Sequence, residues 1–365
     1  MHTNQPQTAS HSNVVRYDGP AAWTAPEMHS SDDWVVRLNA RDIAELASAV
    51  TASRDIPLVS LSRGNIKLPT LGQKLCDVQR EVVERRGFVL IRGLPVAEFD
   101  RETIARMYYG MATWLGDAVP QNAAGHLLGH VKDIGQDPHN PVHRVYATNY
   151  RHLFHTDSCD IVGLLCLHPA KSGGLSAIAS STSLYNQLAC TRPDLADVLA
   201  QPFHVDRKGE IPAGKEPTYE MAVFHHGTNY LTTVYARDFI EAAQRFDNIP
   251  RLSQLQIEAM DMLDDLAASD EFRLDMDFQP GDIQFLHNHQ ILHARTGYED
   301  YPDPKRKRHL LRLWLSAPTG RKLPAVFAER YGEVDVGKIR GGVRVPGQTL
   351  QAPLDAEWLE GATAA

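Results

Sequence analysis

Short apolar stretches, each ended within a few residues by glycine, proline or polar side chains, dominate the chain from about residue 127 onward. Runs of this length are typical of buried strands, because an amphipathic helix needs about ten or more residues. We predict strands at 126–133, 145–148, 163–167, 175–180, 272–278, 283–287 and 310–316. Helical patterns interrupt them at about 183–200 and 253–268. This arrangement favours a mainly β fold, an antiparallel sandwich or barrel with flanking helices, over a doubly wound parallel sheet.

The first third of the chain mixes helix and strand. Apolar residues recur with helical spacing from Asn39 onward and again over Leu71–Arg86. A third helix follows the capping residue Asp100 and reaches about Leu115. The run Gly87–Leu94 is predicted to be a buried strand closed by a glycine turn.

The sequence predicts one flexible arm and one domain. Residues 1–30 are rich in Ser, Thr, Asn, Gln and Pro, which is typical of a mobile segment. The predicted helices and strands follow this segment, and no internal repeat divides them. We therefore expect a single domain over 31–365 with helical insertions and an extended C-terminal segment.

Several classes of protein are disfavoured by what the sequence lacks. It has neither a G-x-G-x-x-G after a strand nor a G-x-x-x-x-G-K-[ST], so it offers no phosphate cradle for a dinucleotide or P-loop nucleotide. A net charge of −8 argues against a nucleic-acid partner. No run of about 18 apolar residues, no signal-peptide pattern and no C-x-x-C pair occurs. We therefore expect a cytoplasmic protein with reduced thiols and no membrane contact.

The segment Phe154–Ser158 contains a histidine and an aspartate two residues apart. On an extended backbone, the side chains of His155 and Asp157 point the same way. One imidazole nitrogen and one carboxylate oxygen would then face a single point. An H-x-D pair arises often by chance, so it does not identify a metal site alone.

Three further histidines, at 287, 289 and 293, crowd the end of a predicted strand after a Pro-Gly-Asp turn. Taken separately, each is more often a buried, hydrogen-bonded residue than a ligand. Joined to His155 and Asp157, any one of His287, His289 and His293 completes two histidines and a carboxylate. That set is the facial triad of non-heme Fe(II) oxygenases, which leaves three positions open for a bidentate cosubstrate and dioxygen.

A basic run, Lys305–Ser316, enters the last predicted strand. Its first residues fit a solvated turn. Arg308 and Arg312, however, are four apart and share one face of the strand. A guanidinium presents paired donors that match a carboxylate. An enzyme that chelates a 2-oxo acid at iron needs such a group for the distant carboxylate of the acid.

These motifs, in this order, resemble the taurine dioxygenase-like (TauD/TfdA) family of Fe(II)- and 2-oxoglutarate-dependent oxygenases. The resemblance covers about residues 85–320, with further anchors at Gly87–Leu94, Lys171–Gly174 and the turn Gly281–Asp282. The family fold is a double-stranded β-helix, a jelly roll with flanking helices. The resemblance implies this fold for the chain.

The resemblance also implies a set of metal ligands. By position they are His155, Asp157 and His293. His293 is preferred over the other two histidines because the family places an asparagine five residues before its last ligand, and Asn288 stands there. Family halogenases lack the carboxylate ligand, so Asp157 disfavours halogenation.

The cosubstrate contacts follow from the same resemblance. Arg308 matches the arginine that binds the distal carboxylate of 2-oxoglutarate, and Arg312 matches a second arginine that reaches substrate or cosubstrate in some relatives. A family threonine that also contacts the cosubstrate corresponds to Ala179, counting from the Gly-Gly pair. Strand alternation places Ser176 and Ser180 on the opposite face from Ala179. Ser180 is our candidate for the missing contact.

The implied reaction uses Fe(II), 2-oxoglutarate and O₂ and releases succinate and CO₂. It oxidises, and as the usual outcome hydroxylates, an unactivated C–H bond of a small polar metabolite such as an amino acid or another carboxylate. The alternative is a cupin-like metalloprotein, an isomerase, hydrolase or binding module, that does not use 2-oxoglutarate. Assembly into a homo-oligomer is left open.

Loops between strands are expected to form the substrate pocket. The candidates are residues 117–126, 135–152 and 205–230. Their cationic and aromatic side chains would suit an anionic or amino-acid-like substrate, although each fits ordinary surface charge equally well. They include His139, His143, Arg144, Arg151, Arg207 and Tyr219.

Overall fold

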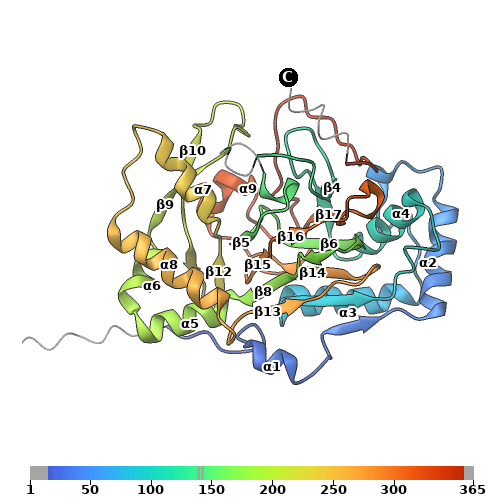
Figure 1. The fold of residues 1–365 in the computed structure, drawn as a ribbon, viewed down its shortest axis with the longest axis horizontal. Coiled ribbons are helices and arrows are strands. Elements are labelled where there is room, and N and C mark those ends of the chain that lie inside the picture. The colour runs from blue at the N-terminus through green and yellow to red at the C-terminus, as the bar shows by residue number, and fades with distance from the viewer. Residues whose placement is uncertain (1–14, 138–139, 141–143, 357–365) are drawn as a thin grey trace, which may run out of the picture.

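The computed structural model of the chain describes residues 15–137, 140 and 144–356. Two β-sheets face each other, and helices cover the outer face of each (Figure 1). The helices are α1 (Ala25–His29), α2 (Ala40–Ala52), α3 (Leu71–Glu84), α4 (Arg101–Ala112), α5 (Ser181–Thr191), α6 (Pro193–Leu199), α7 (Arg237–Ala242), α8 (Gln254–Ala268) and α9 (Ala328–Tyr331).

The larger sheet has seven strands. It runs β1 (Val35–Arg37), β2 (Phe88–Arg92), β14 (Ile283–His287), β6 (Ile161–His168), β17 (His309–Ser316) and β3 (Asp117–Val119), and β4 (Leu128–Val131) also pairs with β17. All of its pairs are antiparallel except β1 with β2. β6 and β17 lie side by side near the centre of this sheet. The last predicted strand, 310–316, is therefore an inner strand of the larger sheet.

The smaller sheet has four antiparallel strands in the order β13 (Leu274–Met276), β8 (Ser176–Ser180), β15 (Ile291–Arg295) and β5 (His152–His155). Three two-stranded pairs complete the described strands. They are β9 (Pro202–Asp206) with β10 (Thr218–Ala222), β11 (Phe224–His226) with β12 (Leu231–Thr233), and β7 (Ser172–Gly173) with β16 (Tyr298–Glu299).

The period-two alternation of the strands divides the core into three layers. Along β17, Leu311 and Leu313 pack toward α2, α3 and α4, whereas Leu310 and Trp314 face the interior between the sheets. The outer face of the smaller sheet packs on α5, α6 and α8, which lie on the left of Figure 1. The interior between the two sheets is therefore where inward-facing polar side chains can meet.

Helix starts follow from capping side chains. Asn39 accepts a hydrogen bond from the backbone N–H of Asp42 at the start of α2, and Asp100 does the same for Thr103 in α4. Ser253 opens α8 with a capping box. One predicted strand was wrong: residues 145–148 contain a short 3₁₀ turn (Val145–Ala147) instead.

The prediction of a flexible arm over residues 1–30 does not hold for residues 15–30, which pack on the domain. Residues 1–14 lie outside the described residues, but Tyr17 and Trp23 are buried, and Trp23 packs on Phe88 in the interior. The backbone oxygen of Ala21 accepts a hydrogen bond from Ser180. Although this segment is polar in composition, the buried side chains of Tyr17 and Trp23 fix it to the rest of the domain.

No helix within the described ranges has the length and apolar character needed to cross a bilayer.

Candidate metal centre and the cavity beside it

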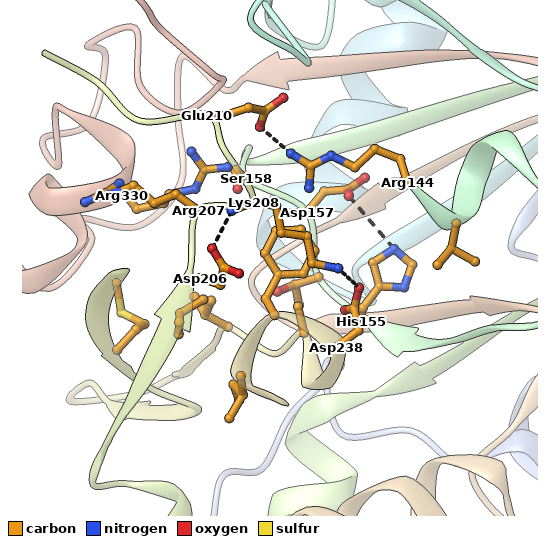
Figure 2. A pocket seen from close by; sticks show the side chains of 18 of the residues that line it. Arg144, His155, Asp157, Ser158, Asp206, Arg207, Lys208, Glu210, Asp238 and Arg330 are labelled. Carbon is orange, nitrogen blue, oxygen red and sulfur yellow. Dashed lines mark hydrogen bonds and ion pairs between the residues drawn. The ribbon is translucent and has the colours of Figure 1, made fainter. Parts of the chain in front are cut away.

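A cavity of about 1010 Å³, counted out to its open mouth, lies beside the end of the smaller sheet. His155 and Asp157 line one side of it. Figure 2 shows Arg207 and Arg330 together on the side away from His155. The cavity thus has a possible metal-binding side and a cationic side.

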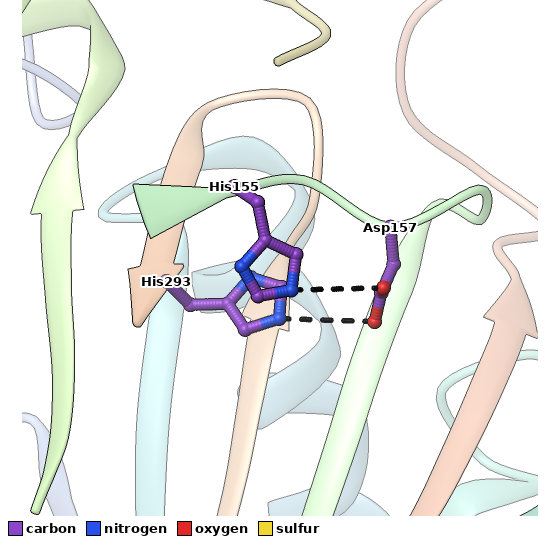
Figure 3. A group of neighbouring side chains, drawn as sticks. All are labelled: His155, Asp157 and His293. Atoms are coloured by element: carbon purple, nitrogen blue, oxygen red, sulfur yellow. Dashed lines mark ion pairs between the residues drawn. The ribbon is translucent and has the colours of Figure 1, made fainter. Parts of the chain in front are cut away.

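The two histidines of the predicted triad lie opposite each other on neighbouring strands. His155 ends β5 and is the register partner of His293 on β15, so their ring centroids are 4.1 Å apart. Asp157 follows two residues after β5 and faces both rings (Figure 3). Its Oδ1 lies 3.9 Å from His155 Nε2, and its Oδ2 lies 3.7 Å from His293 Nε2. The structure therefore brings together three residues that are up to 138 positions apart.

Asn288 fixes the backbone around Asp157. The N–H of Asp157 donates to Asn288 Oδ1 at 2.7 Å, and Asn288 Nδ2 donates to the backbone oxygens of Asp157 and Cys159 at 2.6 and 3.0 Å. The Asp157 carboxylate in turn accepts a hydrogen bond from Trp314 Nε1 at 2.8 Å and lies 3.5 Å from Arg312 Nη1. This carboxylate is therefore held in place from both its backbone and its side-chain end.

The electrostatics leave His293 and Asp157 in the protonation states that a metal requires. Burial and the neighbouring His155 lower the pKa of His293 to about 3, so its imidazole is neutral at pH 7. Burial alone would raise the pKa of Asp157, but the charges of Arg312 and the two histidines, with the Trp314 hydrogen bond, lower it overall. His155 directs Nδ1 at the backbone oxygen of Leu153 at 2.8 Å, which leaves Nε2 free.

The three side chains fit a divalent transition metal. Their ligand atoms all lie within 4.8 Å of one another. Adjacent ligand atoms on an octahedral ion are about 3 Å apart when each bond is about 2.1 Å. The observed separations, at most 4.8 Å, therefore need to shorten by less than about 2 Å. Two neutral imidazoles and one carboxylate are the donor set of the non-heme Fe(II) facial triad.

The other two candidate histidines lie elsewhere. His289 Nε2 pairs with Asp160 at 2.9 Å, and Asp160 also pairs with the buried Arg340. His287 is buried at the end of β14, next to His289. Both belong to a buried polar cluster that does not include the three triad residues, so they are structural residues here.

Arg308 and Arg312 both face the interior, as predicted, but they lie in different surroundings. Arg312 lines the cavity, where Gln121 Oε1 accepts from its Nε at 2.7 Å and Asp157 lies nearby. Arg308 is 3 % exposed and does not line this cavity among the described residues. Its Nη2 donates to the backbone oxygen of Gly174 at 3.3 Å, and no described group accepts from Nη1.

A second buried guanidinium lies beside Arg308. Arg295 stands two residues after His293 on β15 and therefore on the same face. Both guanidiniums lie over the Tyr298 ring, 4.8 Å (Arg295) and 5.2 Å (Arg308) from its centroid. Burial and the charge of Arg308 lower the pKa of Arg295 to about 10. Arg295 Nε and Nη1 and the Tyr298 hydroxyl have no described partner, so this cluster has the donors of a buried anion site.

The predicted cosubstrate contact at Ser180 receives no support from the geometry. The Ser180 hydroxyl donates to the backbone oxygen of Ala21 and accepts from the N–H of Ser183, because it caps α5. Ala179 packs on the helical side of the smaller sheet. Ser176 instead pairs in register with Arg295 and shares its face. Of these residues, Ser176 is the one beside the arginines.

Some site residues were missed from the sequence. Arg295 could have been found, because a histidine and an arginine two apart on a strand share a face. Arg330, from the short helix α9, carries no such signal. Of the loop candidates, Arg144, Arg207 and Tyr219 line the cavity. Arg151 is exposed and is not among the described lining residues, and His139 and His143 lie outside the described residues.

A comparison with protein families decides between the interpretations. The model of the family described as "Taurine catabolism dioxygenase TauD, TfdA family" matches residues 52–314. The chain belongs to the TauD/TfdA family. The predicted family, its jelly-roll fold, the oxygenase activity and the cofactors Fe(II) and 2-oxoglutarate are thereby confirmed, and the cupin-like alternative is set aside.

Two named relatives match most of the chain. This chain is 29 % identical over 326 residues to FR-33289 synthase from Streptomyces rubellomurinus, and the alignment covers 86 % of this chain and 94 % of that protein. It is 32 % identical over 304 residues to the taurine hydroxylase-like protein SAT17 from Stachybotrys chartarum, covering 80 % and 77 %.

Solved structures share the TauD/TfdA fold at low sequence identity. Asparagine oxygenase in complex with Fe(II), 2S,3S-3-hydroxyasparagine and succinate aligns with a TM-score of 0.61 and 17 % identity over 78 % of this chain and 93 % of that one. The non-heme iron oxygenase OrfP in complex with Fe and alpha-ketoglutaric acid aligns with a TM-score of 0.58 and 15 % identity over 77 % and 94 %. At this identity the likeness concerns the fold.

Proposed function

We propose that His155, Asp157 and His293 hold Fe(II) in this enzyme and that it hydroxylates a C–H bond of a small, anionic metabolite. The observation that carries the ligand assignment is the convergence of the three ligand atoms on one point beside the cavity. When bound, Fe(II) with 2-oxoglutarate and O₂ supplies the oxidising power, and the reaction releases succinate and CO₂. The neutral imidazole of His293 and the ionised carboxylate of Asp157 are ready to bind the ion at neutral pH.

Arg308 and Arg295 bind the distal carboxylate of 2-oxoglutarate in this proposal. Support comes from their burial, from unpartnered N–H groups on both side chains and from their closeness to each other. Two buried like charges need an anion between them, because an unpaired buried charge is costly. Ser176, which shares the face of Arg295, replaces Ser180 as the hydroxyl that we assign to this carboxylate.

Arg312 has a different role in the proposal. It contacts the Asp157 carboxylate, lies between Tyr146 and Trp314, and lines the cavity. These contacts support a role in orienting Asp157 and in contacting the bound substrate. We therefore propose that Arg308 binds the distal carboxylate and that Arg312 faces the substrate, the two roles that the sequence had left open between them.

The substrate class is supported by the cavity and by relatives. Five cationic side chains line the cavity. Among the relatives, asparagine oxygenase acts on an amino acid, and an Amycolatopsis protein 25 % identical over 251 residues is named uridine-5'-phosphate dioxygenase. Both compounds carry an anionic group. We further propose a cytoplasmic enzyme that acts on free metabolites and binds no nucleic acid; a homo-oligomeric state stays a prediction.

The ligand assignment is tested with paired histidine variants. His293→Ala should lose Fe(II) binding, measured as metal content and as the visible absorption of the anaerobic Fe(II)–2-oxoglutarate chelate. His287→Ala removes an equally buried histidine outside the triad and should retain both signals. Iron binding by His293→Ala together with its loss in His287→Ala would show that the wrong histidine was assigned. Circular dichroism of both variants checks that they fold.

The reaction is tested by turnover. Purified protein with Fe(II), ascorbate and 2-oxoglutarate should form succinate, and a substrate should accelerate its release. A panel of amino acids, sulfonates and phosphate esters then identifies the substrate class. Absence of succinate under all of these conditions would contradict the proposed function.

A further inference from the structure

The cavity wall opposite the triad contains a cationic pair that the reaction so far does not use. Arg207 follows β9, and Arg330 lies in α9. The Arg207 guanidinium lies over the ring of Tyr219 at 4.7 Å. Burial raises the pKa of the Tyr219 phenol, and the nearby charge of Arg330 opposes this effect. Both arginines and the tyrosine line the cavity. Figure 2 shows the two arginines on the side away from His155.

Arg207 is held firmly but is not fully paired. It is 4 % exposed, its Nε donates to the backbone oxygen of Glu216 at 3.0 Å, and its Nη2 pairs with Glu329. Its Nη1 is buried and has no partner among the described residues. Burial and the nearby Arg330 charge lower the pKa of Arg207, although Glu329 opposes this. A buried guanidinium with an unused donor at a cavity wall is arranged for an anion.

Arg330 adds a charge that no described carboxylate balances. Its side chain is half-buried, and within the described residues no carboxylate lies within ion-pairing distance of it. Glu329, its neighbour in sequence, is already shared by Arg207 and Lys215. The pair Arg207 and Arg330 therefore carries uncompensated positive charge at the cavity wall.

The charges around the whole cavity also sum to a positive excess. Five cationic side chains line it, and two more, Lys215 and Arg245, pair with carboxylates of its wall. Against these seven stand four lining carboxylates and Glu329, so the described residues leave an excess of two positive charges. Fe(II) and the dianion of 2-oxoglutarate cancel each other, so this excess remains for the substrate.

We infer that Arg207, Arg330 and Tyr219 bind a dianionic phosphoryl group, a phosphate ester or a phosphonate, on the substrate. This inference rests on the proposed function and names the substrate class more closely. A dianion neutralises the excess charge, whereas a carboxylate or sulfonate leaves half of it. Three phosphoryl oxygens can accept from both guanidiniums and from the phenol at once. The group would thereby hold the rest of the substrate toward the triad.

The test measures binding of small probes to the metal-free protein. Propyl phosphate and propylphosphonate present the dianion, while propanesulfonate and butyrate are monoanions of similar size. Calorimetric titration at mildly alkaline pH, where both phosphorus probes are doubly charged, should give about tenfold tighter binding for at least one of them than for either monoanion. The tighter of the two identifies the source of the group.

Variants locate the site. Arg330→Gln removes a half-buried charge at the cavity wall and should weaken phosphoryl binding about tenfold, which is the value of one charge-assisted hydrogen bond. Lys322→Gln is the control, because Lys322 is an exposed lysine that pairs with Asp335, does not line the cavity and does not contribute to its excess charge, and it should bind the probe like the wild type. Arg330 is chosen over Arg207 because loss of the buried Arg207 would also leave Glu329 without that partner.

Two results would overturn the inference. One is equal affinity of the wild type for the dianions and the monoanions. The other is an unchanged affinity in Arg330→Gln, or an equal loss in Lys322→Gln. The anaerobic Fe(II)–2-oxoglutarate absorption of the wild type separates this failure from that of the proposed function. If the chelate forms and no dianion preference exists, only the phosphoryl site is wrong.

Discussion

At the scale of single residues, Gly174 shows how a missing side chain positions a binding group. A Cβ atom at Gly174 would lie 2.9 Å from Arg308 Nε, and the backbone there has φ +71°. The Gly174 oxygen also accepts a hydrogen bond from Arg308 Nη2. The Arg308 guanidinium therefore packs directly against the backbone of Gly174, and this contact fixes the direction of the guanidinium.

Gly174→Ala should raise the 2-oxoglutarate concentration needed for half-maximal succinate release by about tenfold, because a displaced guanidinium loses about one charge-assisted hydrogen bond. Titration of the anaerobic chelate absorption measures the same change. Gly214→Ala is the control, since Gly214 has φ +73° but no atom within 4 Å of its Cβ position. Equal behaviour of the two variants would show that backbone strain, rather than contact with Arg308, causes the effect.

Single residues also show what the sequence could and could not predict. The H-x-D motif and the arginine spacing predicted which side chains face inward. Counting from the Gly-Gly pair led instead to Ala179 and Ser180, because a count along the chain does not say which residue of β8 lies beside which residue of β15. Only the register, which pairs Ser176 with Arg295, shows which serine is next to the arginines.

At the scale of elements, predictions succeeded where local side chains set the boundary. The caps of α2, α4 and α8 are examples. The hairpins β9–β10 and β11–β12 were missed, because their strands are short and their polar residues hide any alternation. Residues of β9 and β10 form part of the cavity wall, so the missed hairpin is also part of the site.

One inter-element contact is a chain of buried histidines between β4, β17 and the C-terminal segment. His130 Nδ1 lies 2.8 Å from His309 Nε2, and His130 Nε2 lies 2.9 Å from the backbone oxygen of Pro353. Both rings satisfy these contacts as neutral imidazoles, one donating to the next. Burial lowers the pKa of His130 to about 4, and burial with the His130 charge lowers that of His309 to about 2.

Stability should therefore fall as the pH drops from about 6.5 toward 4, because the unfolded chain binds protons that the folded chain excludes. For His130 alone the shift corresponds to about 3 kcal/mol. Urea unfolding at several pH values should show a shallower fall for His130→Gln than for the wild type. His29→Gln, at an exposed site, should follow the wild type. An unchanged pH dependence in His130→Gln would mean that His130 titrates normally in the fold.

At the scale of the whole molecule, the facing sheets bring residues from distant segments to one point. Motif order predicted that His155 and His293 meet, but it did not predict that the N-terminal segment closes the interior. Trp23 is 3 % exposed there and its Nε1 donates to the backbone oxygen of Arg86 at 3.0 Å. The surrounding polar composition gave no hydrophobic pattern from which this packing could be inferred.

Trp23→Ala should lower the free energy of unfolding by about 3–5 kcal/mol, because it leaves a large cavity between the sheets and an unpaired backbone oxygen. Urea unfolding measures the change. Val15→Ala alters a side chain in the same segment that is 50 % exposed, and it should change the stability by about 0.5 kcal/mol or less. A small effect of Trp23→Ala would show that the segment is only loosely attached.

The hydrogen bonds of Asn288 to the backbone N–H and oxygen of Asp157 have a consequence for the order of folding and metal binding. These contacts lie within the polypeptide and hold the Asp157 backbone without an ion, so little of the affinity for an ion at this site would be consumed in ordering the segment. Folding can then come first and metal insertion afterwards. Protein stripped of metal with a chelator should therefore regain Fe(II) on simple addition of the ion, without a refolding step.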